Sequence, residues 1–339
     1  MHALKVVHIG LGKTATSSLQ AHVFPRLAEM GMVRRYNPPP VMQALDGVVN
    51  GWLSEAQAAA DFADIDDVLI SNETLVEWDP AYWEEGSDRL LRLFGPDATI
   101  ILTLREPDSY LRSLYQQMLH SGKIRTPQDA FLPANAYQAV RRFIRPGELE
   151  AINIDAFDLS QLINLYATRF RSVLLLPVET LGGMGFLGAL WPVSEADRAA
   201  LARAFAAAPR VNISYSRLAV RLTLGRERLL AGLGLRSLSA SDAQLQRALF
   251  HSRGKTPVPK RSVVPSWNRL MRILTWYGPK TPFALPPELY LGQHQARNRA
   301  VYATLRAAAE GYVHLRDGRS VAFDPIAVPD PGITKEKCV

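Results

Sequence analysis

The sequence has a single cysteine and no long hydrophobic run. Cys338 is next to the last of the 339 residues, so no intramolecular disulfide can form, which suits a reducing compartment. No apolar stretch approaches the roughly 20 residues that a membrane helix needs. A strand-like apolar run begins at Leu4 and leaves no room ahead of it for the basic and hydrophobic parts of a secretory leader. We therefore expect a cytoplasmic protein with neither a membrane span nor a cleaved leader.

The chain also lacks any recurring period, which excludes repeat and collagen-like architectures. Hydrophobic residues make up 47% of the chain and charged residues 21%, enough apolar side chain to offset the entropy of folding. The 39 Lys and Arg against 32 Asp and Glu give a net charge of +7, which favours an anionic ligand. A nucleotide, a phosphorylated lipid, an acidic sugar and a nucleic acid are all compatible with this charge.

Short apolar runs alternate with helical patterns through the first half of the chain. Strands are predicted at residues 4–9, 67–72, 98–105 and from 172 into a loop at 179; helices are predicted at 19–30, 54–65, 88–94, 107–122 and 159–170. The proline-rich stretch 37–40 between the first two helices is predicted to be a loop. Strands that alternate with helices pair in parallel and carry helices on both faces. The sequence therefore predicts a three-layer α/β fold with a central, mostly parallel sheet.

The second half of the chain carries a weaker β signal and is predicted to be largely helical. The basic segment 251–267 is predicted to be a long loop, the last helix to span residues 287–309, and the tail at 311–325 to form a small hairpin. No clean linker divides two domains. We expect one domain over residues 1–339, with a nucleotide-binding core at 1–182 and a mostly helical remainder at 183–339.

The loop after the first predicted strand, GLGKTATSS, is rich in small and hydroxyl residues and leads into a helix. Backbone N–H groups at such a turn point toward an anion, and Lys13 adds a mobile positive charge. The loop of nucleoside-triphosphate-binding proteins does not match, because Val7 stands where its first glycine belongs; a dinucleotide fingerprint does not match either, because Ala15 replaces its third glycine. The alternative is an ordinary tight turn with a surface lysine.

The run HIGLGKTATSSLQ resembles the 5′-phosphosulfate loop of the sulfotransferases that use 3′-phosphoadenosine 5′-phosphosulfate. That loop typically reads P-K-[ST]-G-T-[ST]-x-L, so Gly12 replaces a proline and Ala15 a glycine. Alanine costs little at this position if its φ is negative and more if its φ is positive. The resemblance implies a P-loop-like nucleotide-binding fold in which the phosphosulfate is held by Gly12, Lys13, Thr14, Ala15, Thr16 and Ser17.

A second segment, LREPDSYLRS, resembles the 3′-phosphate-binding pattern of the same family. Arg105 ends a predicted strand, and Ser113 follows eight residues later on the next helix. A guanidinium grips phosphate through two hydrogen bonds, and a serine hydroxyl adds a third donor. The alternatives are a capping ion pair for Arg105 and a solvated helical serine for Ser113.

One carboxylate and two histidines are further candidates. Glu73 closes the second predicted strand, where ligands bind in open α/β sheets; the resemblance implies a general base, and the alternative is a carboxylate that only complements a helix dipole. His8 lies inside a strand and is expected to be a hydrogen-bonded core residue. His120 could line an acceptor site, but a surface histidine near a helix C-terminus is the favoured interpretation.

The resemblance implies a sulfotransferase that uses 3′-phosphoadenosine 5′-phosphosulfate, releases adenosine 3′,5′-bisphosphate and needs no metal. Lys13 and Glu73 would be catalytic, and the partners would be this nucleotide and a hydroxylated acceptor rather than a nucleic acid. The alternatives are a P-loop kinase or other nucleotide phosphotransferase and a non-catalytic nucleotide-binding protein. The acceptor (a glycan, a glycolipid or a small metabolite) and the oligomeric state cannot be read from the sequence.

Overall fold

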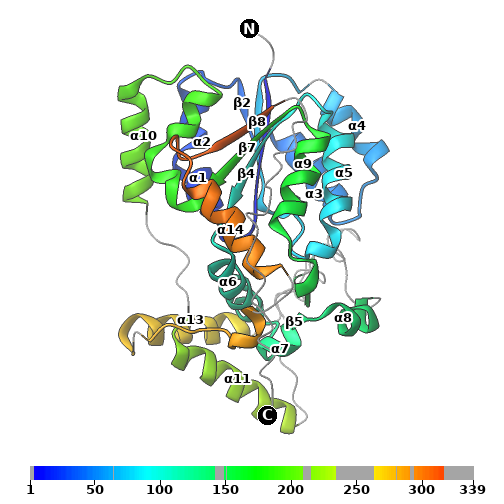
Figure 1. The fold of residues 1–339 in the computed structure, drawn as a ribbon, viewed down its shortest axis with the longest axis vertical. Coiled ribbons are helices and arrows are strands. Elements are labelled where there is room, and N and C mark those ends of the chain that lie inside the picture. Colours follow the sequence, from blue (N-terminus) through cyan, green and yellow to red (C-terminus); the bar gives the residue numbers. More distant parts are fainter. Residues whose placement is uncertain are drawn as a thin grey trace, which may run out of the picture.

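A computed structural model of the chain describes residues 4–63, 65–141, 149, 151–208, 215–233, 263–279, 281–290 and 294–316. At its centre is a sheet with the strand order β2-β3-β1-β4-β7-β8 (Figure 1). The strands of this sheet are β1 (Lys5–Gly10), β2 (Arg35–Tyr36), β3 (Val68–Ser71), β4 (Thr99–Leu104), β7 (Ser172–Pro177) and β8 (Val313–Arg316). A small second sheet pairs β5 (Phe131–Leu132) with β6 (Ile152–Asn153).

The main sheet is parallel except at one edge, where β8 pairs antiparallel with β7. Strand β1 lies between β3 and β4, with Val7 opposite Ile70 on one side and Ile100 on the other. The chain therefore builds the sheet on one side of β1 first and then crosses to the other side. Ligands of open α/β sheets bind at the carboxyl end of the strands at such a reversal.

Helices cover both faces of the sheet, as predicted. They are α1 (Thr16–His22), α2 (Phe24–Glu29), α3 (Pro39–Val49), α4 (Glu55–Ala63), α5 (Trp83–Phe94), α6 (Pro107–His120), α7 (Pro127–Ala130), α8 (Ala134–Val140), α9 (Leu159–Arg169), α10 (Glu195–Ala207), α11 (Arg217–Gly232), α13 (Val263–Tyr277) and α14 (Gln295–Arg306). Helices α1, α2 and α10 lie on one side of the sheet and α3, α4, α5 and α9 on the other (Figure 1).

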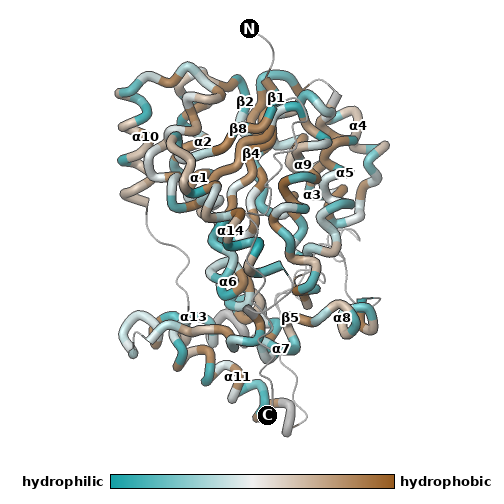
Figure 2. The backbone as a smooth tube through the Cα atoms, in the orientation of Figure 1, coloured by the Kyte–Doolittle hydropathy of each residue, from teal (hydrophilic) through white to brown (hydrophobic). Residues whose placement is uncertain are grey.

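Alternate residues of each strand supply the two cores. Ile100 and Leu102 belong to the core under α5 and α9, whereas Ile101 between them belongs to the core under α1 and α10. The strands are the most hydrophobic part of the tube in Figure 2, because a sheet covered on both faces needs apolar side chains at consecutive positions. The three-layer α/β fold is therefore confirmed.

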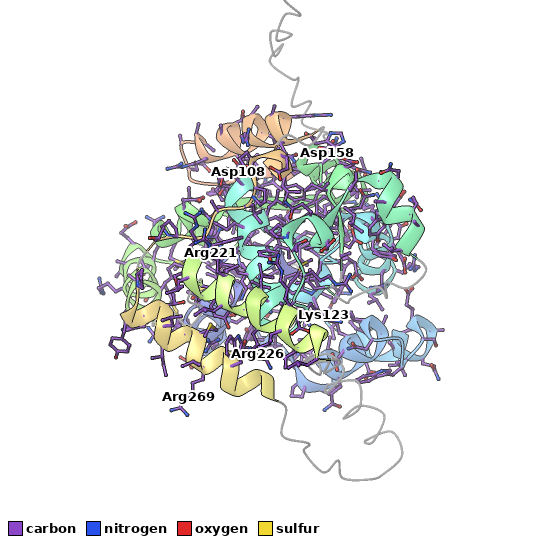
Figure 3. All side chains as sticks on the ribbon, turned by 90° about the horizontal axis from the view of Figure 1, so that it is seen from below. Asp108, Lys123, Asp158, Arg221, Arg226 and Arg269 are labelled. Carbon is purple, nitrogen blue, oxygen red and sulfur yellow. The ribbon has the colours of Figure 1, made fainter. Side chains whose placement is uncertain are left out.

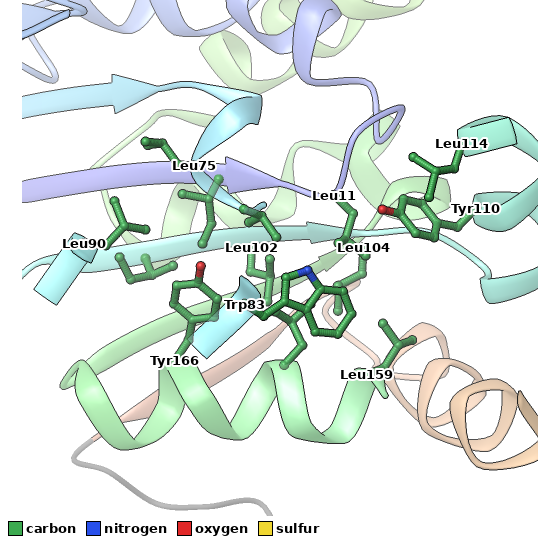
Figure 4. Close-up of a cluster of buried hydrophobic side chains, with 14 of the residues drawn as sticks. Leu11, Leu75, Trp83, Leu90, Leu102, Leu104, Tyr110, Leu114, Leu159 and Tyr166 are labelled. Carbon is green, nitrogen blue, oxygen red and sulfur yellow. The ribbon is translucent and has the colours of Figure 1, made fainter. Parts of the chain in front are cut away.

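Trp83 is a central side chain of the larger core, packed between the sheet and α9 among Leu75, Leu102 and Tyr166 (Figure 4). It is 2% exposed, and its indole N–H donates to the Glu77 carbonyl at 3.0 Å, so burial leaves no polar atom unsatisfied. Truncation of such a side chain to alanine costs about 3–5 kcal/mol.

Two local predictions in the first half of the chain are wrong. The helix predicted over residues 19–30 is broken at Val23 into α1 and α2, because Pro25 has no N–H to donate to the preceding turn and its ring crowds that turn. In the predicted loop at 37–40, Pro39 and Pro40 instead form the first turn of α3, where a missing N–H costs nothing.

In the second half of the chain, two secondary-structure predictions are wrong in part, and a third falls partly outside the described residues. Residues 263–267 of the predicted loop begin α13, while residues 251–262 lie outside the described residues. The last helix, α14, starts at Gln295 rather than at 287, and Pro287–Tyr290 form only a 3-10 turn. In the segment predicted to be a tail hairpin, residues 313–316 form the edge strand β8, paired with β7; residues from 317 on lie outside the described residues, so the hairpin itself stays a prediction. In the described part of the chain, no helix is both long and apolar enough to span a bilayer.

His8 lies on β1 with no exposed surface, as expected of a core histidine. Its Nδ1 is 2.7 Å from Ser71 Oγ, but its Nε2 has no hydrogen-bond partner among the described residues. Burial lowers its pKa from 6.5 to about 3. Between these values the unfolded chain binds a proton that the folded chain does not, so stability is complete above pH 6.5 and falls as the pH is lowered.

We therefore expect acidification to unfold the protein partly through His8. A His8→Gln variant should be less stable at pH 7, yet it should lose about 3 kcal/mol less than the parent between pH 6.5 and pH 4. Urea unfolding at a series of pH values measures both. Equal pH dependence in parent and variant would show that His8 is not the buried neutral group that the structure indicates.

Candidate active site

The loop between β1 and α1 holds two non-glycine residues in the left-handed region. Lys13 has φ 70° and Ala15, which caps α1, has φ 62°; Thr14 between them does not share the positive φ. Such an alternation points successive backbone N–H groups into one concavity, which is a binding site for an anion. Ala15 thus has the costly conformation, and it occupies the position where the family pattern has glycine.

The hydroxyls of this loop do not all face the same way. The Thr14 hydroxyl donates to the Leu11 carbonyl at 2.6 Å and is 2.7 Å from the Thr103 hydroxyl of β4. Thr14 therefore braces the loop against the sheet, and only its backbone is left to face a ligand. Thr16 is buried beside it, whereas Ser17 is exposed on the first turn of α1.

Gly12 departs from the family proline for a visible reason. A Cβ at position 12 would overlap the ring of Trp78, which lies against the loop. A Cβ on Gly10 would likewise crowd the hydroxyls of Thr14 and Thr16, at 2.7 and 2.8 Å. The two glycines therefore allow side chains to pack directly on the loop backbone, and Trp78 is a neighbour that no sequence motif had indicated.

Arg105 joins the two predicted phosphate-binding segments. Its Nη1 donates to the Lys13 carbonyl at 3.0 Å and to Ser113 Oγ at 3.2 Å. Lys13 and Arg105 are 92 residues apart in sequence, yet they meet at the carboxyl ends of β1 and β4. Ser113 is only 9% exposed, so it is not a solvated serine. In the described part of the chain Arg105 has no ion pair, which also removes the capping alternative.

Ser109 is a second serine at the same guanidinium, and our sequence reasoning missed it. Its hydroxyl accepts from Arg105 Nε at 3.0 Å, and Arg112 Nη2 lies 3.4 Å from the same oxygen. Ser109 and Ser113 are four residues apart on α6, so helical spacing alone would have placed both beside Arg105. Burial and then the charge of Arg112 lower the pKa of Arg105, so its surroundings disfavour an added positive charge and favour an anion.

Glu73 begins a single 3-10 turn, Glu73–Leu75, that follows β3. Asn72 caps this turn by accepting from the Thr74 N–H at 2.9 Å. Since the next α-helix, α5, starts only at Trp83, the helix dipole that Glu73 was supposed to complement is not there. Glu73 instead lies close enough to Lys13 to affect its ionisation.

Lys13 is a half-buried cation among charged neighbours. Burial lowers the pKa of its ammonium group, the carboxylate of Glu73 opposes this, and Arg272 and Arg105 lower the pKa further. The structure therefore brings Lys13, Glu73, Arg105 and Ser113 to one end of the sheet. Arg272, on α13, was not predicted because it lies beyond the recognisable segments.

His120, at the end of α6, is mostly buried, so its interpretation as a surface histidine is wrong. Its ring packs edge-on against Tyr215 with centroids 4.2 Å apart, and its buried Nε2 has no partner among the described residues. Burial, with the charges of Lys13 and Arg272, lowers its pKa to about 4. His120 is therefore a neutral imidazole near Lys13 at physiological pH and can accept a hydrogen bond.

Helix α13 is attached to this end of the molecule by hydrogen bonds. Asn268 Nδ2 donates to the His120 carbonyl at 2.8 Å, and the Tyr215 hydroxyl donates to Asn268 Oδ1 at 2.9 Å. These contacts hold Arg272, one turn further along α13, near Lys13 and His120. The helical second half of the chain thus completes the site that the first half begins.

A cavity of about 520 Å³ opens where α6 begins. Its walls are the residues just after Arg105 and one face of α14: Glu106, Pro107, Arg299, Tyr302, Ala303, Arg306 and Ala307. Arg299 is held there by Asp108 at 2.9 Å, and the Tyr302 hydroxyl donates to the carboxylate of Glu179. The cavity extends the site beyond Arg105.

Comparisons with known proteins agree with this geometry. Residues 5–167 match the family model described as a sulfotransferase domain. A crystal structure of a sulfotransferase from Alicyclobacillus acidocaldarius is similar at 16% identity and a TM-score of 0.38, covering 79% of this chain and 100% of that one. A search of curated proteins found no match. The domain match covers a little under half of the chain, and the structural likeness is too low to carry an argument.

The left-handed Ala15 leads to a stability prediction. An Ala15→Gly substitution should stabilise the protein by about 1 kcal/mol, because glycine adopts positive φ without a steric cost. The greater entropy of glycine in the unfolded chain would by itself predict the opposite, a loss of stability. Ala59→Gly, at an exposed position in the middle of α4, is the matched control and should destabilise by about 0.5–1 kcal/mol. If both variants lose stability equally in urea unfolding, Ala15 does not have a positive φ in solution.

Proposed function

We propose that this chain, whose residues 5–167 match a sulfotransferase domain, is a sulfotransferase that uses 3′-phosphoadenosine 5′-phosphosulfate as its donor and a hydroxyl or amine as its acceptor. The observation that supports this donor best is Arg105, which touches both Ser113 and the backbone of the Lys13 loop. A donor with phosphate groups at two positions of one nucleoside needs two neighbouring anion sites of this kind.

The two ends of the donor are assigned to different elements. The 5′-phosphosulfate lies at the N–H groups of residues 12–17, where α1 begins, with Lys13 beside it. The 3′-phosphate lies against Arg105 and Ser113, where charge-assisted hydrogen bonds are strongest. The cavity at the start of α6 gives the nucleoside room next to the 3′-phosphate.

Catalysis then rests on charge and position. The acceptor oxygen or nitrogen forms a bond to sulfur as the bond from sulfur to the bridging phosphate oxygen breaks, and negative charge grows on that oxygen. The Lys13 ammonium and the loop N–H groups stabilise this charge, which is the step at which they contribute most. A base removes the acceptor's proton, and adenosine 3′,5′-bisphosphate leaves.

Glu73 is the base that we propose, because its carboxylate is close enough to Lys13 to raise the pKa of that lysine. The same contact makes Glu73 useful before the reaction, since it favours the charged form of Lys13. His120 is a second group near Lys13, and its buried Nε2 has no hydrogen-bond partner among the described residues. The two groups therefore need to be tested side by side.

The donor assignment predicts a difference between two ligands. Arg105→Ala should weaken the binding of adenosine 3′,5′-bisphosphate roughly 10- to 100-fold more than that of adenosine 5′-phosphate, since a charge-assisted hydrogen bond contributes about 1.5–3 kcal/mol. Both ligands should lose some affinity, because Arg105 also anchors the Lys13 loop. Calorimetric titration measures both constants.

Two further variants make this test sharper. Ser113→Ala should weaken the bisphosphate only, since its hydroxyl makes no contact with the loop. Arg171→Ala removes an exposed arginine beside the amino end of β7, paired with Asp97, and should change neither constant. Equal losses of the two ligands in both Arg105→Ala and Ser113→Ala would contradict the placement of the 3′-phosphate.

The base assignment predicts a loss of rate rather than of binding. Glu73→Gln should lower the single-turnover rate roughly 10²- to 10⁴-fold, because an amide cannot take the acceptor's proton, and should leave bisphosphate affinity nearly unchanged. His120→Gln should change the rate much less. Rates are measured with radiolabelled donor and the acceptor that a panel of hydroxylated compounds identifies.

The pH profile separates a base from an electrostatic neighbour. If Glu73 serves only to keep Lys13 charged, Glu73→Gln should retain the parental maximum rate and lose activity at a lower alkaline pH, because the pKa of Lys13 falls without the carboxylate. A large loss of rate in His120→Gln with full activity in Glu73→Gln would transfer the role of base to His120.

A further inference from the structure

Helices α11 and α13 carry an apolar surface that faces solvent. Among the described residues, the large hydrophobic side chains that are strongly exposed lie on or next to these two helices, with one exception, Trp52. They are Leu222, Leu229, Leu233, Leu270, Ile273, Trp276 and Tyr277. A contiguous exposed apolar patch on a folded protein marks an interaction site more often than a packing defect.

The exposed residues follow helical spacing. On α11, Leu222, Leu229 and Leu233 are separated by seven and four residues, which places them on one face. On α13, Leu270, Ile273 and Tyr277 are separated by three and four residues and also share a face. Both helices therefore have an apolar stripe, and we call the two stripes with the arginines around them the α11–α13 face.

The opposite sides of the two helices are already packed. Val220 and Met271 are buried members of the larger hydrophobic core, and Trp267 Nε1 donates to Thr223 Oγ1 at 3.2 Å. The Arg226 guanidinium lies 5.0 Å from the centre of the Trp267 ring. The helices thus have an inner face that holds them to the domain and an outer apolar face whose leucine and isoleucine side chains remain exposed among the described residues.

The same part of the chain carries its excess of positive charge. Residues 217–277 contain twelve Lys and Arg but only two acidic residues, Glu227 and Asp242, whereas the rest of the chain has 27 Lys and Arg against 30 Asp and Glu. On the helices, Arg217, Arg221, Arg228 and Arg269 are exposed. In Figure 3 the labelled Arg221, Arg226 and Arg269 lie on these helices at the end of the molecule that faces the viewer.

This combination of charge and hydrophobicity selects among partners. A second copy of the chain in a two-fold contact would oppose one arginine-rich face with an identical one, which is unfavourable. A nucleic acid would satisfy the arginines but not the leucines, since such interfaces are strongly polar. A membrane with anionic lipids satisfies both, because apolar stripes enter the acyl boundary while arginines contact the headgroups.

The α11–α13 face also lies close to the candidate active site. Figure 1 shows α11 and α13 beyond α6, at the carboxyl end of the sheet. Asn268 binds the backbone of His120, and Arg272, also on α13, affects the ionisation of Lys13. A surface that binds the α11–α13 face would therefore lie close to the part of the candidate active site that contains Lys13 and His120.

We propose that the α11–α13 face docks the protein on an anionic lipid surface. If the proposed function holds, the acceptor is then a lipid-linked hydroxyl or amine that reaches the Lys13 site from that surface. The docking itself does not depend on catalysis, so the two parts can fail independently.

The test uses the full chain and vesicles of two compositions. Co-sedimentation should show binding to vesicles of phosphatidylcholine with phosphatidylglycerol and little binding to phosphatidylcholine alone, and added salt should weaken the binding. Equal affinity for both compositions, or no binding to either, would overturn the proposal. A parallel thermal shift with adenosine 3′,5′-bisphosphate reports on the nucleotide site separately.

Matched variants locate the contact. Leu229→Ser combined with Leu270→Ser should weaken vesicle binding at least tenfold, whereas Trp52→Ser, which removes an equally exposed apolar side chain elsewhere, should have no effect. Arg221→Gln and Arg269→Gln should each cost roughly fivefold, and Arg171→Gln should cost nothing. All variants should keep the parental thermal shift with the bisphosphate.

Other outcomes overturn the proposal. If Trp52→Ser weakens binding as much as the double leucine variant, the contact is nonspecific. If the parent forms a dimer in analytical ultracentrifugation that the leucine substitutions dissociate, and vesicles do not bind, the face is an interface between copies. If heparin competes fully for binding and the leucine substitutions have no effect, the face binds soluble polyanions and not a lipid surface.

Discussion

The arrangement of the candidate site depends on the Arg105 guanidinium. It bonds to a backbone carbonyl of the β1 loop and to two serines of α6, so one side chain sets the distance between two elements that are remote in sequence. All three acceptors are neutral, and no carboxylate lies within ion-pair distance among the described residues. The nearest acid in sequence, Glu106, is occupied as the cap of α6, where it accepts from the N–H groups of Asp108 and Ser109.

A half-buried cation without a counter-ion is costly in a folded protein. This cost is lowered when an anion binds. The unfavourable free energy of the uncompensated charge in the unbound protein therefore adds to the affinity for a phosphate. The backbone of the loop follows the same logic, since two non-glycine residues with positive φ are strained in order to direct N–H groups at one point. The buried charges of Arg105 and Lys13 and the positive φ of Ala15 each cost the folded protein free energy. All three residues belong to the site proposed for the same ligand.

The β1 loop, the position of Arg105 at the end of a strand and Pro107 in the first turn of α6 could be predicted because they depend on neighbours in sequence. Strand periodicity, the conformational limits of proline and the i, i+4 spacing of α6 are local rules, and the structure follows them. The Lys13 loop, Glu73 and Arg105 each follow or end a parallel strand, and parallel strands end together, so the same local rules are consistent with one shared edge of the sheet.

The features that sequence reasoning missed depend on contacts between distant segments. Whether His120 is buried is decided by Tyr215 and Asn268, which come about one hundred and one hundred and fifty residues later and carry no recognisable motif. Trp78 cannot be linked to Gly12 without knowing that the segment after β3 folds back over the β1 loop. Arg272 was missed because the segment before it was predicted to be a loop, although α13 begins at Val263.

The electrostatics of α13 link the outer face of the protein to its chemistry. Arg272 disfavours the charged forms of both Lys13 and His120, while Glu73 favours the charged form of Lys13. An anionic surface against α13 would offset part of the Arg272 charge, because negative charge stabilises protonated groups nearby. The pKa of Lys13 would then rise toward its ordinary value.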